Sequence, residues 1–239
     1  MELSLYAGAE PGEGSLELLG MPNIISSDQN GRSVAIVDDM TNDGVQDILV
    51  GAPGSADEGK SPEFGRVHIY KGTGTGLDHE YFKSMKGFMQ TANGIEVGYV
   101  VGSVGDVDGD GKNDFAFHAR ETSQPNSFDA ELYLAPPACQ TKRSSVGATY
   151  VFLGGPGSGY TSTEPAFIFY GPEVNRDPEK MVGGFDIDGD GYDDIAMASR
   201  TFRGEQNLNN AGGVAFYRGT FDTPGKVTVG CEPHAFFTG

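Results

Sequence analysis

The sequence predicts an all-β protein built from repeated units of four short antiparallel strands. An acidic loop recurs at Asp39, Asp106 and Asp186, with separations of 67 and 80 residues. A glycine-bounded apolar segment follows each loop, as in Gly65-Arg-Val-His-Ile-Tyr-Lys-Gly72. Glycine contributes 37 of the 239 residues, about twice an average usage of ~7%, which indicates many turns. Repeats of this kind are typical of proteins that stack one supersecondary unit.

The expected strands of each repeat are short and apolar. The first runs from Ser33 to Val37, and the second follows the loop, as in Asp47-Ile-Leu-Val-Gly51. Short runs that are apolar on both faces favour buried strands over helices, which need more length. The other expected strands are second strands at 114–117 and 194–197, third strands at 65–72, 147–154 and 212–219 with a further copy at 2–8, and fourth strands at 80–85, 165–170 and 233–237.

Four strands in a repeat of about 65–80 residues are typical of a β-propeller blade with long loops. We predict one propeller domain in which residues 1–29 are the two outer strands of a partial blade and 30–90, 91–171 and 172–239 are three complete blades. Such an arc is open, and exposed sheet edges invite association. We therefore expect a segment of a longer chain, or an arc closed by a second copy or by another protein.

Two of the loops have the pattern of a Ca²⁺ site. They are Asp106-Val-Asp-Gly-Asp-Gly-Lys-Asn-Asp114 and Asp186-Ile-Asp-Gly-Asp-Gly-Tyr-Asp-Asp194. Ca²⁺ accepts six to eight oxygens in a flexible shell, and the glycine at position 6 permits the tight turn around the ion. The expected ligands are the side chains of Asp106, Asp108, Asp110 and Asp114 with the Lys112 carbonyl, and the side chains of Asp186, Asp188, Asp190 and Asp194 with the Tyr192 carbonyl.

A solvated acidic turn without an ion is the competing interpretation. Two carboxylates ~5 Å apart repel by about 3 kcal/mol at an effective dielectric constant of ~20, so four that converge would open the loop. Mg²⁺ suits the loops less well, because it demands octahedral geometry and keeps its waters. An EF-hand needs a bidentate Glu at position 12, where these loops have Phe117 and Met197. Asn113 and Asp193, at position 8, are expected to point to solvent.

The loop from Asp39 to Asp47 is a degenerate copy. The expected ligands are the side chains of Asp39, Thr41, Asp43 and Asp47 with the Val45 carbonyl, so that a hydroxyl replaces the carboxylate of position 3. The number of charged ligands tunes the affinity of a Ca²⁺ loop. The sequence therefore predicts two Ca²⁺ sites and a weaker third.

The acidic composition excludes some partners. The formal net charge is −18, and phosphate groups of nucleic acids or anionic membranes need a basic surface. No apolar stretch is long enough to insert into a membrane, and the N-terminus lacks the features of a signal peptide. Bound cations would offset much of the charge, because 13 of the 34 acidic residues lie in or beside the loops, namely Asp38, Asp39, Asp43, Asp47, Asp106, Asp108, Asp110, Asp114, Asp186, Asp188, Asp190, Asp193 and Asp194.

Catalytic motifs are weak in this sequence. The four histidines are dispersed, and no G-x-S-x-G or zinc signature occurs. The glycine-rich runs lead into strands rather than helices, so a phosphate cradle at a helix N-terminus lacks its context. We therefore expect neither enzymatic activity nor an organic cofactor.

The order of these motifs resembles the FG-GAP repeat of integrin α-chain propellers and of bacterial extracellular proteins with similar repeats. Gly51-Ala-Pro53 matches the GAP element, whereas His118-Ala-Arg120 and Ala198-Ser-Arg200 occupy its place in the other repeats. At the FG element the sequence has Asn30-Gly31, Val97-Gly98 and, in the third repeat, Pro178. The resemblance covers nearly the whole chain and is most specific at the two intact loops.

The resemblance implies Ca²⁺ loops on the lower face of the propeller and partner-binding loops on its upper face. The candidate contact segments are Pro53–Phe64, Glu121–Val146 and Thr201–Ala211. In this layout Cys139 lies on the upper face and Cys231 on the lower face, so no disulfide between them is expected.

The implied function is an adhesion module, extracellular or at the cell surface, that binds a protein or glycan while Ca²⁺ stabilises its scaffold. Loops of weak to moderate affinity fill at extracellular rather than cytosolic Ca²⁺ concentrations. The alternatives are a non-catalytic ancillary domain of a secreted enzyme of the polysaccharide lyase or phospholipase type, and a propeller lectin.

Overall fold

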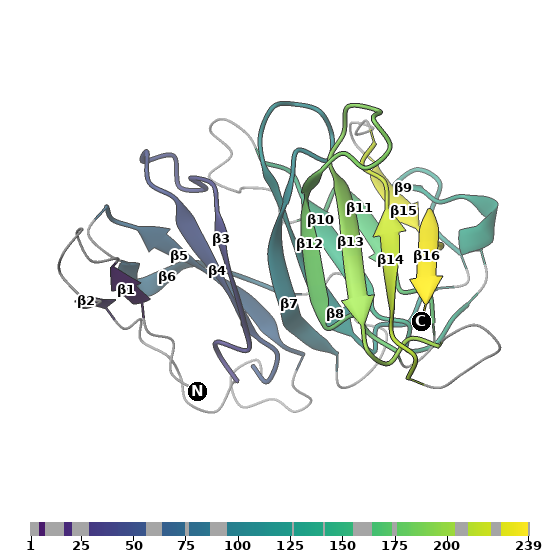
Figure 1. The fold of residues 1–239 in the computed structure, drawn as a ribbon, viewed down its shortest axis with the longest axis horizontal. Helices are drawn as coiled ribbons and strands as arrows, with labels where there is room; N and C mark the ends of the chain where they lie inside the picture. Colours follow the sequence, from purple (N-terminus) through teal and green to yellow (C-terminus); the bar gives the residue numbers. More distant parts are fainter. Residues whose placement is uncertain are drawn as a thin grey trace.

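The computed structural model describes residues 5–7, 17–20, 29–55, 64–74, 77–86, 95–125, 127–140, 142–154, 164–173, 176–203, 210–220 and 226–238. In these ranges all regular structure is β-strand except η1, a 3₁₀ turn at Pro137–Cys139 (Figure 1). The predicted all-β fold is confirmed. Across the same ranges, no helix has the length and apolar character needed to cross a membrane.

The first large sheet shows how one repeat folds. It contains β3 (Ser33–Val37), β4 (Asp47–Ala52), β5 (Arg66–Gly72) and β6 (Leu77–Met85), paired antiparallel in chain order. Every residue of β4 is buried. This explains why its sequence is apolar without alternation, since a strand covered on both faces needs no polar side.

Two further sheets repeat this order. One starts with β7 (Glu96–Gly105), β8 (Asp114–Arg120), β10 (Ala148–Phe152) and β11 (Phe167–Tyr170), and the other contains β12 (Lys180–Phe185), β13 (Asp194–Ser199), β14 (Gly213–Tyr217) and β16 (Ala235–Thr238). The strands β1 (Leu5–Ala7) and β2 (Glu17–Gly20) form a separate antiparallel pair. The predicted four-strand unit is present, while the number and bounds of the propeller blades stay predictions.

The sheets pack face to face around their first strands. β7 lies between β3 and β12 (Figure 1). One hydrophobic cluster joins the sheet of β3 to that of β7 through side chains such as Leu49 and Phe117. A second cluster joins the sheet of β7 to that of β12 through side chains such as Val151 and Met197. This stacking of twisted antiparallel sheets is that of a propeller arc.

The junction between the first two large sheets depends on glycine. Gly51 of β4 and Gly98 of β7 meet backbone to backbone, and a Cβ atom on Gly51 would overlap the Gly98 carbonyl. Gly98 also has φ +83°, a backbone region that L side chains avoid. The glycines of the GAP and FG elements therefore belong to one contact, which lets two sheets approach closely.

At the next junction a buried polar cluster replaces that contact. His118 occupies the position of Gly51, and its Nε2 lies 3.2 Å from Asp177 Oδ1 while its Nδ1 lies 2.9 Å from Thr149 Oγ1. Arg120 Nε lies 3.5 Å from the other oxygen of Asp177. In this repeat His118-Ala-Arg120 stands in place of the GAP element. The side chains of His118 and Arg120 fill the space between the two sheets.

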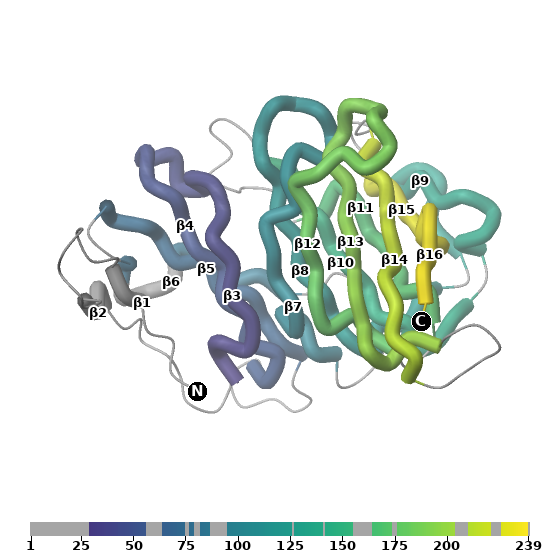
Figure 2. Tube along the Cα trace, viewed as in Figure 1, coloured from purple at the N-terminus to yellow at the C-terminus, as the bar shows by residue number. Residues whose placement is uncertain are grey.

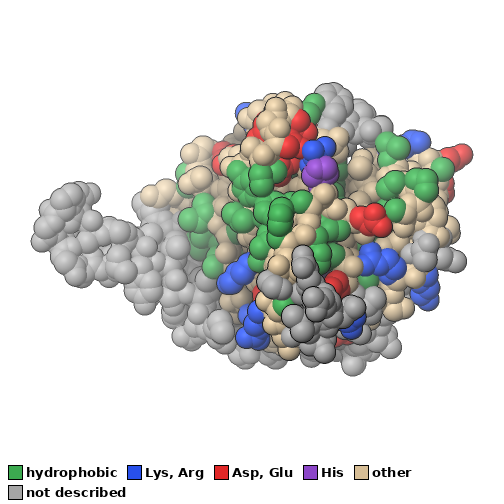
Figure 3. All heavy atoms as spheres, turned by 45° about the vertical axis from the view of Figure 1, so that its right-hand side comes forward, with side chains coloured by type: hydrophobic (Ala, Val, Ile, Leu, Met, Phe, Trp, Pro, Cys, Tyr) green, Lys and Arg blue, Asp and Glu red, His purple; other side chains and the backbone are tan. Residues whose placement is uncertain are grey.

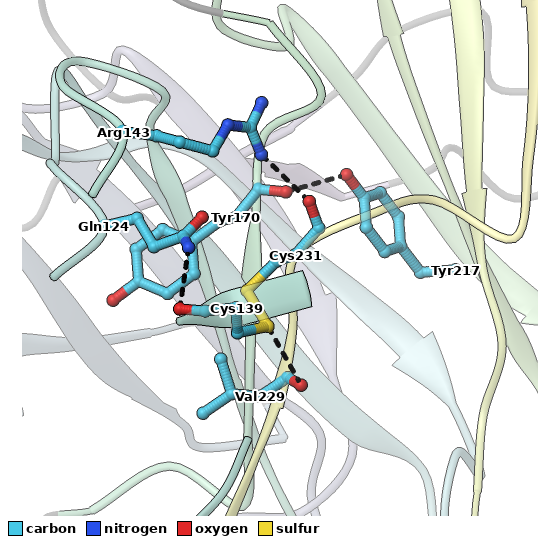
Figure 4. The surroundings of a disulfide bond; sticks show 7 residues. All are labelled: Gln124, Cys139, Arg143, Tyr170, Tyr217, Val229 and Cys231. Atoms are coloured by element: carbon cyan, nitrogen blue, oxygen red, sulfur yellow. Dashed lines mark hydrogen bonds between the residues drawn. A yellow bond between two sulfur atoms is a disulfide. The ribbon is translucent and has the colours of Figure 1, made fainter. Parts of the chain in front are cut away.

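Cys139 and Cys231 form a disulfide (Figure 4), so the expectation that they do not pair is wrong. That expectation assumed that the chain turns directly from the third strand of its repeat to the fourth. After β14, however, the chain first forms β15 (Val227–Gly230), which pairs in parallel with β11 of the preceding sheet (Figure 2). Cys231, which follows β15, therefore lies at the C-terminal end of β11. The segment 121–146, which contains Cys139, lies at the same end.

The segment 121–146 is held against the sheet at several points. Its short strand β9 (Tyr133–Leu134) pairs in parallel with β15. Arg143 donates hydrogen bonds from Nη1 to the Cys231 carbonyl at 2.9 Å and from Nη2 to the Pro172 carbonyl at 2.6 Å. The Gln124 amide donates to the Cys139 carbonyl at 3.0 Å (Figure 4). The long connection is thus a tethered addition to the edge of the sheet.

Hydrophobic side chains remain exposed on the sheet that contains β12 and β16. Val182 is 57% exposed and Phe237 is 63% exposed. Figure 3 shows hydrophobic side chains gathered on the face that it displays, with acidic side chains beside them. Association through the sheet edges of an open arc stays a prediction.

Candidate metal centre

The three acidic loops lie together at one end of the sheets. Each joins a first strand to a second, from β3 to β4, from β7 to β8 and from β12 to β13. Neighbouring loops touch: Asn113 Nδ2 donates to Asp38 Oδ2 at 2.9 Å, and the Asp193 N–H donates to the Asp106 carbonyl at 2.8 Å. The segment that follows Arg120 leaves from the opposite end, as the resemblance implies.

Both intact loops gather three carboxylates at one point. Ligand atoms of Asp106, Asp108 and Asp114 all lie within 4.8 Å of one another, as do those of Asp186, Asp188 and Asp194. The structure therefore brings together the expected ligands of positions 1, 3 and 9. The side chains at position 5, Asp110 and Asp190, stand outside these clusters.

Backbone hydrogen bonds shape each turn around its first carboxylate. Asp106 accepts from the N–H groups of Gly109, Asp110 and Gly111 at 2.8–2.9 Å. Asp186 accepts from Gly189, Asp190 and Gly191 at 2.6–3.2 Å. The residues of position 7, Lys112 and Tyr192, donate their N–H groups to Asp110 and Asp190. The chain thus folds back over the acidic cluster, as a cation loop requires.

The carboxylate of position 9 ties each loop to the third strand of its repeat. In the middle loop Asp114 accepts from Val107 N–H at 2.9 Å and from Gly154 N–H at 2.6 Å. Asp194 accepts in the same way from Ile187 and Gly219, and Asp47 from Met40 and Gly72. A Cβ atom on Gly154 would overlap the Asn113 carbonyl, so the contact needs glycine.

This contact explains why the two repeated motifs occur together. In the sequence the acidic loop and the closing glycine stand as two separate motifs. Their separation is a usable signal, since Gly72 follows Asp47 and Gly219 follows Asp194 by the same 25 residues. In the middle repeat Gly154 follows Asp114 by 40 residues, because the long connection lies between them.

The buried carboxylate of Asp114 and the exposed carboxylate of Asp186 differ in the direction of their pKa shifts. Burial raises the pKa of Asp114 to about 8, although the N–H groups of Gly154 and Val107 oppose the shift. Hydrogen bonds from Gly191, Gly189 and neighbouring N–H groups lower the pKa of Asp186. A divalent cation among these oxygens would favour the ionised form of Asp114, since an adjacent opposite charge stabilises a carboxylate. The donor set of hard, anionic oxygens fits Ca²⁺.

The first loop keeps the turn but not the acidic cluster. Asp39 accepts from Asp43 N–H at 3.0 Å and from Gly44 N–H. Within the described residues, no three acidic ligand atoms of this loop converge. Thr41 Oγ1 is buried and has no hydrogen-bond partner, which leaves an oxygen available to an ion. Lys71 Nζ lies 3.0 Å from Asp43 Oδ2 and would compete with a cation.

Basic side chains at the end of the third strand differ between the repeats. Lys71 pairs with Asp43 in the first loop, and Arg218 pairs with Asp188 in the last. The equivalent residue of the middle repeat is Leu153. The middle loop therefore has no ammonium or guanidinium competitor at this position.

The side chains at position 8 are expected from the sequence to point to solvent, and of the two Asn113 is exposed whereas Asp193 is half-buried. Asn113 donates to Asp38 in the loop of the preceding repeat, and Asp193 Oδ2 accepts from the Asp106 N–H at 2.9 Å. The loops are packed side by side, so a side chain directed away from its own ion site meets the next loop. The sequence of one loop gives no sign of this contact, because the partner belongs to a neighbouring repeat.

A comparison with known protein families finds matches at two of the three repeats. A model of the FG-GAP repeat matches residues 30–70 and 179–217. The chain contains FG-GAP repeats. The matched ranges hold the first and last acidic loops with the strands β3 and β4 in one case and β12, β13 and β14 in the other. The middle FG-GAP-like unit, with the loop Asp106–Asp114, folds as the same hairpin but lies outside the matched ranges.

Integrin α chains are similar over most of the chain. Integrin alpha-5 of Xenopus laevis is 29% identical over 181 residues, 71% of this chain and 14% of that protein. Integrin alpha-4 of Xenopus laevis is 29% identical over 167 residues, and integrin alpha ina-1 of Caenorhabditis elegans is 28% identical over 184 residues. These cover 67% and 71% of this chain. The chain spans about one seventh of the length of these relatives.

Proposed function

We propose that this chain is a Ca²⁺-binding FG-GAP β-propeller module that binds an extracellular protein or glycan in adhesion. The observation that carries the proposal is the convergence of three carboxylates within 4.8 Å in each intact loop. Anionic oxygens at that separation repel one another unless a cation lies among them. The sites are those of Asp106–Asp114 and Asp186–Asp194, and the loop Asp39–Asp47 is a weaker third site.

The role of the ions in this proposal is structural. The carboxylates of position 9 are hydrogen-bonded to the third strand, so an ion held by the loop braces the first, second and third strands together. Ions at this end stiffen the scaffold from which the opposite end presents its loops. The ligand carboxylates are then saturated by Ca²⁺, which makes them poor proton donors and supports a binding role without catalysis.

Partner binding is assigned to the end opposite the acidic loops. The candidate segments there are Pro53–Phe64, Glu121–Val146 and Thr201–Ala211, although residues 56–63 and 204–209 lie outside the described residues. Near this end Arg32 and Arg120 lie over the ring of Tyr99, with guanidinium carbons 4.3 and 4.5 Å from its centroid. The disulfide between Cys139 of the segment 121–146 and Cys231 supports an extracellular location, because disulfides persist in oxidising compartments.

Titration calorimetry with Ca²⁺ tests the base of the proposal. The protein is stripped with EGTA, and heats of binding and melting temperatures are measured with and without Ca²⁺. Binding heat for two sites and a raised melting temperature are expected, because a ligand bound only by the folded state stabilises it. Asp108→Ala and Asp188→Ala should each remove one site. No binding heat together with unchanged melting would overturn the proposal.

The class of partner requires a separate experiment. Binding to a glycan array, with and without EGTA, distinguishes a glycan-binding module from a protein-binding one. Loss of signal on EGTA treatment is expected if the ions hold the ligand-binding loops in place. A catalytic domain on the same polypeptide would instead favour the ancillary role in a secreted enzyme.

A further inference from the structure

Neighbouring loops are joined through the metal-ligand residues themselves. Asp193 lies between Tyr192 and Asp194, two expected ligands of the last loop. Its Oδ2 accepts from the backbone N–H of Asp106 at 2.9 Å, and its own N–H donates to the Asp106 carbonyl at 2.8 Å. Asp106 is the first ligand of the middle loop. One residue of the last loop therefore holds both backbone polar groups of a ligand in its neighbour.

Packing around this pair leaves little freedom for one loop to move alone. Gly105 has φ +78°, and a Cβ atom there would overlap the Asp193 carboxylate. Gly109 lies against the ring of Tyr192, with no room for a side chain between them. Thr220 N–H donates to the Val107 carbonyl at 2.8 Å. Residues 105–109 are thus seated on the last repeat.

We propose that Asp193 positions Asp106 and thereby couples the two Ca²⁺ sites, so that they fill cooperatively. The inference rests on the proposed Ca²⁺ binding. When Tyr192 and Asp194 are held on an ion, Asp193 between them is held as well, and Asp106 keeps its backbone in place. The middle loop then loses less conformational freedom on binding its own ion. The coupling is reciprocal, because each site changes the affinity of the other by the same factor.

The junction between the first and middle loops supplies a contrast. Asn113 occupies position 8 of the middle loop, as Asp193 does in the last, but it donates to the side chain of Asp38. Asp38 precedes the first ligand of its loop and is not itself an expected ligand. Asn113 therefore does not hold the backbone of a ligand, and coupling across this junction is weaker. Asn113→Ala is the matched control for Asp193→Ala.

Charge and hydrogen bonding at Asp193 can be separated by substitution. Asp193→Ala removes both the negative charge and the acceptor for the Asp106 N–H. Asp193→Asn removes the charge but keeps a carbonyl oxygen that accepts the same hydrogen bond. If Asp193 acts by positioning, Asn restores the coupling that Ala abolishes.

The experiment is a Ca²⁺ titration of the whole chain, followed by NMR of the ¹⁵N-labelled protein. The amide signals of Gly111 and Gly191, both at position 6, report the filling of the middle and last loops separately. In the wild type both should shift together with a Hill coefficient above 1. Asp188→Ala, which removes a ligand from the last loop only, should weaken filling at Gly111 about tenfold, within the range of coupling between sites.

The variants decide between coupling and independence. Asp193→Ala should make the two glycine signals titrate independently, while Asp193→Asn and Asn113→Ala keep them linked. Dispersed spectra in excess Ca²⁺ establish that each variant is folded. If Gly111 fills equally well in Asp188→Ala and the wild type, the coupling is refuted and Ca²⁺ binding stands. If no glycine signal responds to Ca²⁺, the proposed function fails instead.

Discussion

Gly154→Ala tests whether the glycine that ends the third strand is needed to fasten the acidic loop. The new Cβ atom would lie closer than 3.0 Å to the Asn113 carbonyl, and 3.3 Å from the Lys112 Cβ. The strand must move away, and the hydrogen bond from Gly154 N–H to Asp114, 2.6 Å long, is lost or stretched.

Two costs contribute to the expected loss of stability. Overpacking of this kind costs about 1–3 kcal/mol. With Ca²⁺ bound, which favours the ionised form of Asp114, the lost hydrogen bond to a charged group costs about 1.5–3 kcal/mol more. Together they lower the free energy of unfolding by about 2.5–6 kcal/mol. For a domain of this size 1 kcal/mol corresponds to about 2–4 °C, so the melting temperature should fall by roughly 5 °C or more.

Urea unfolding monitored by circular dichroism measures the change, in Ca²⁺ and in EGTA. The matched control is Gly102→Ala on β7, where the new Cβ atom meets the flexible end of Met181 at 3.2 Å. This substitution should cost less than ~1 kcal/mol, because the methionine end can move aside. Equal stabilities of the Gly154→Ala and Gly102→Ala variants would refute the assignment of Gly154 as the anchor of Asp114.

Three further predictions concern the disulfide, the buried acid and the degenerate loop. Replacing Cys139 and Cys231 together by serine should lower the free energy of unfolding by about 4 kcal/mol, since the bond closes a loop of 92 residues in sequence; urea unfolding with and without a reductant checks this. Burial by itself would raise the pKa of Asp177, but the hydrogen bond and charge of His118 and the charge of Arg120 outweigh it and lower that pKa. The ionised Asp177 carboxylate therefore stabilises the fold above the unfolded pKa of ~3.9, and this stabilisation is lost as the pH falls through the lower folded pKa. The free energy of unfolding of Asp177→Asn should be lower than that of the wild type at pH 7, and should change less with pH below pH ~4. Thr41→Asp supplies the missing carboxylate of position 3 and should raise the Ca²⁺ affinity of the first loop about tenfold or more, which calorimetry would detect as a third binding event; an unchanged affinity would contradict the role of Thr41 as a ligand position.

Much of the fold follows from local pattern. The short apolar runs after Asp47, Asp114 and Asp194 became strands β4, β8 and β13 because strands buried on both faces need no alternation. The carboxylates of positions 1, 3 and 9 lie close together because a nine-residue turn is a local structure, while their role as ligands stays a prediction. The glycines that permit the turn and the N–H groups that bond its first carboxylate belong to the same nine residues.

The cysteine pair shows where sequence reasoning failed. A regular repeat predicts that the chain passes from β14 to the adjacent fourth strand, which would keep Cys231 away from Cys139. The detour through β15 depends on pairing with β11, more than 50 residues earlier in the chain, and no local pattern near Val227–Gly230 indicates that partner. The polar cluster of His118 and Asp177 was missed for the same reason, since the two residues meet only when two sheets pack.

The acidic loops show the same division within one site. Sequence by itself determined which residues form each loop, because ion binding and tight turns depend on carboxylates and glycines at short fixed spacing. Only the tertiary structure decided what surrounds the loops: Gly154, just after the third strand, donates to Asp114, and Asp193 of the next repeat lies beside Asp106. In each contact a side-chain carboxylate accepts from a backbone N–H group. Backbone N–H groups are common to nearly all residues, so the sequence does not identify the donor; strand pairing within a sheet supplies it for Asp114, and the stacking of one sheet on the next supplies it for Asp193.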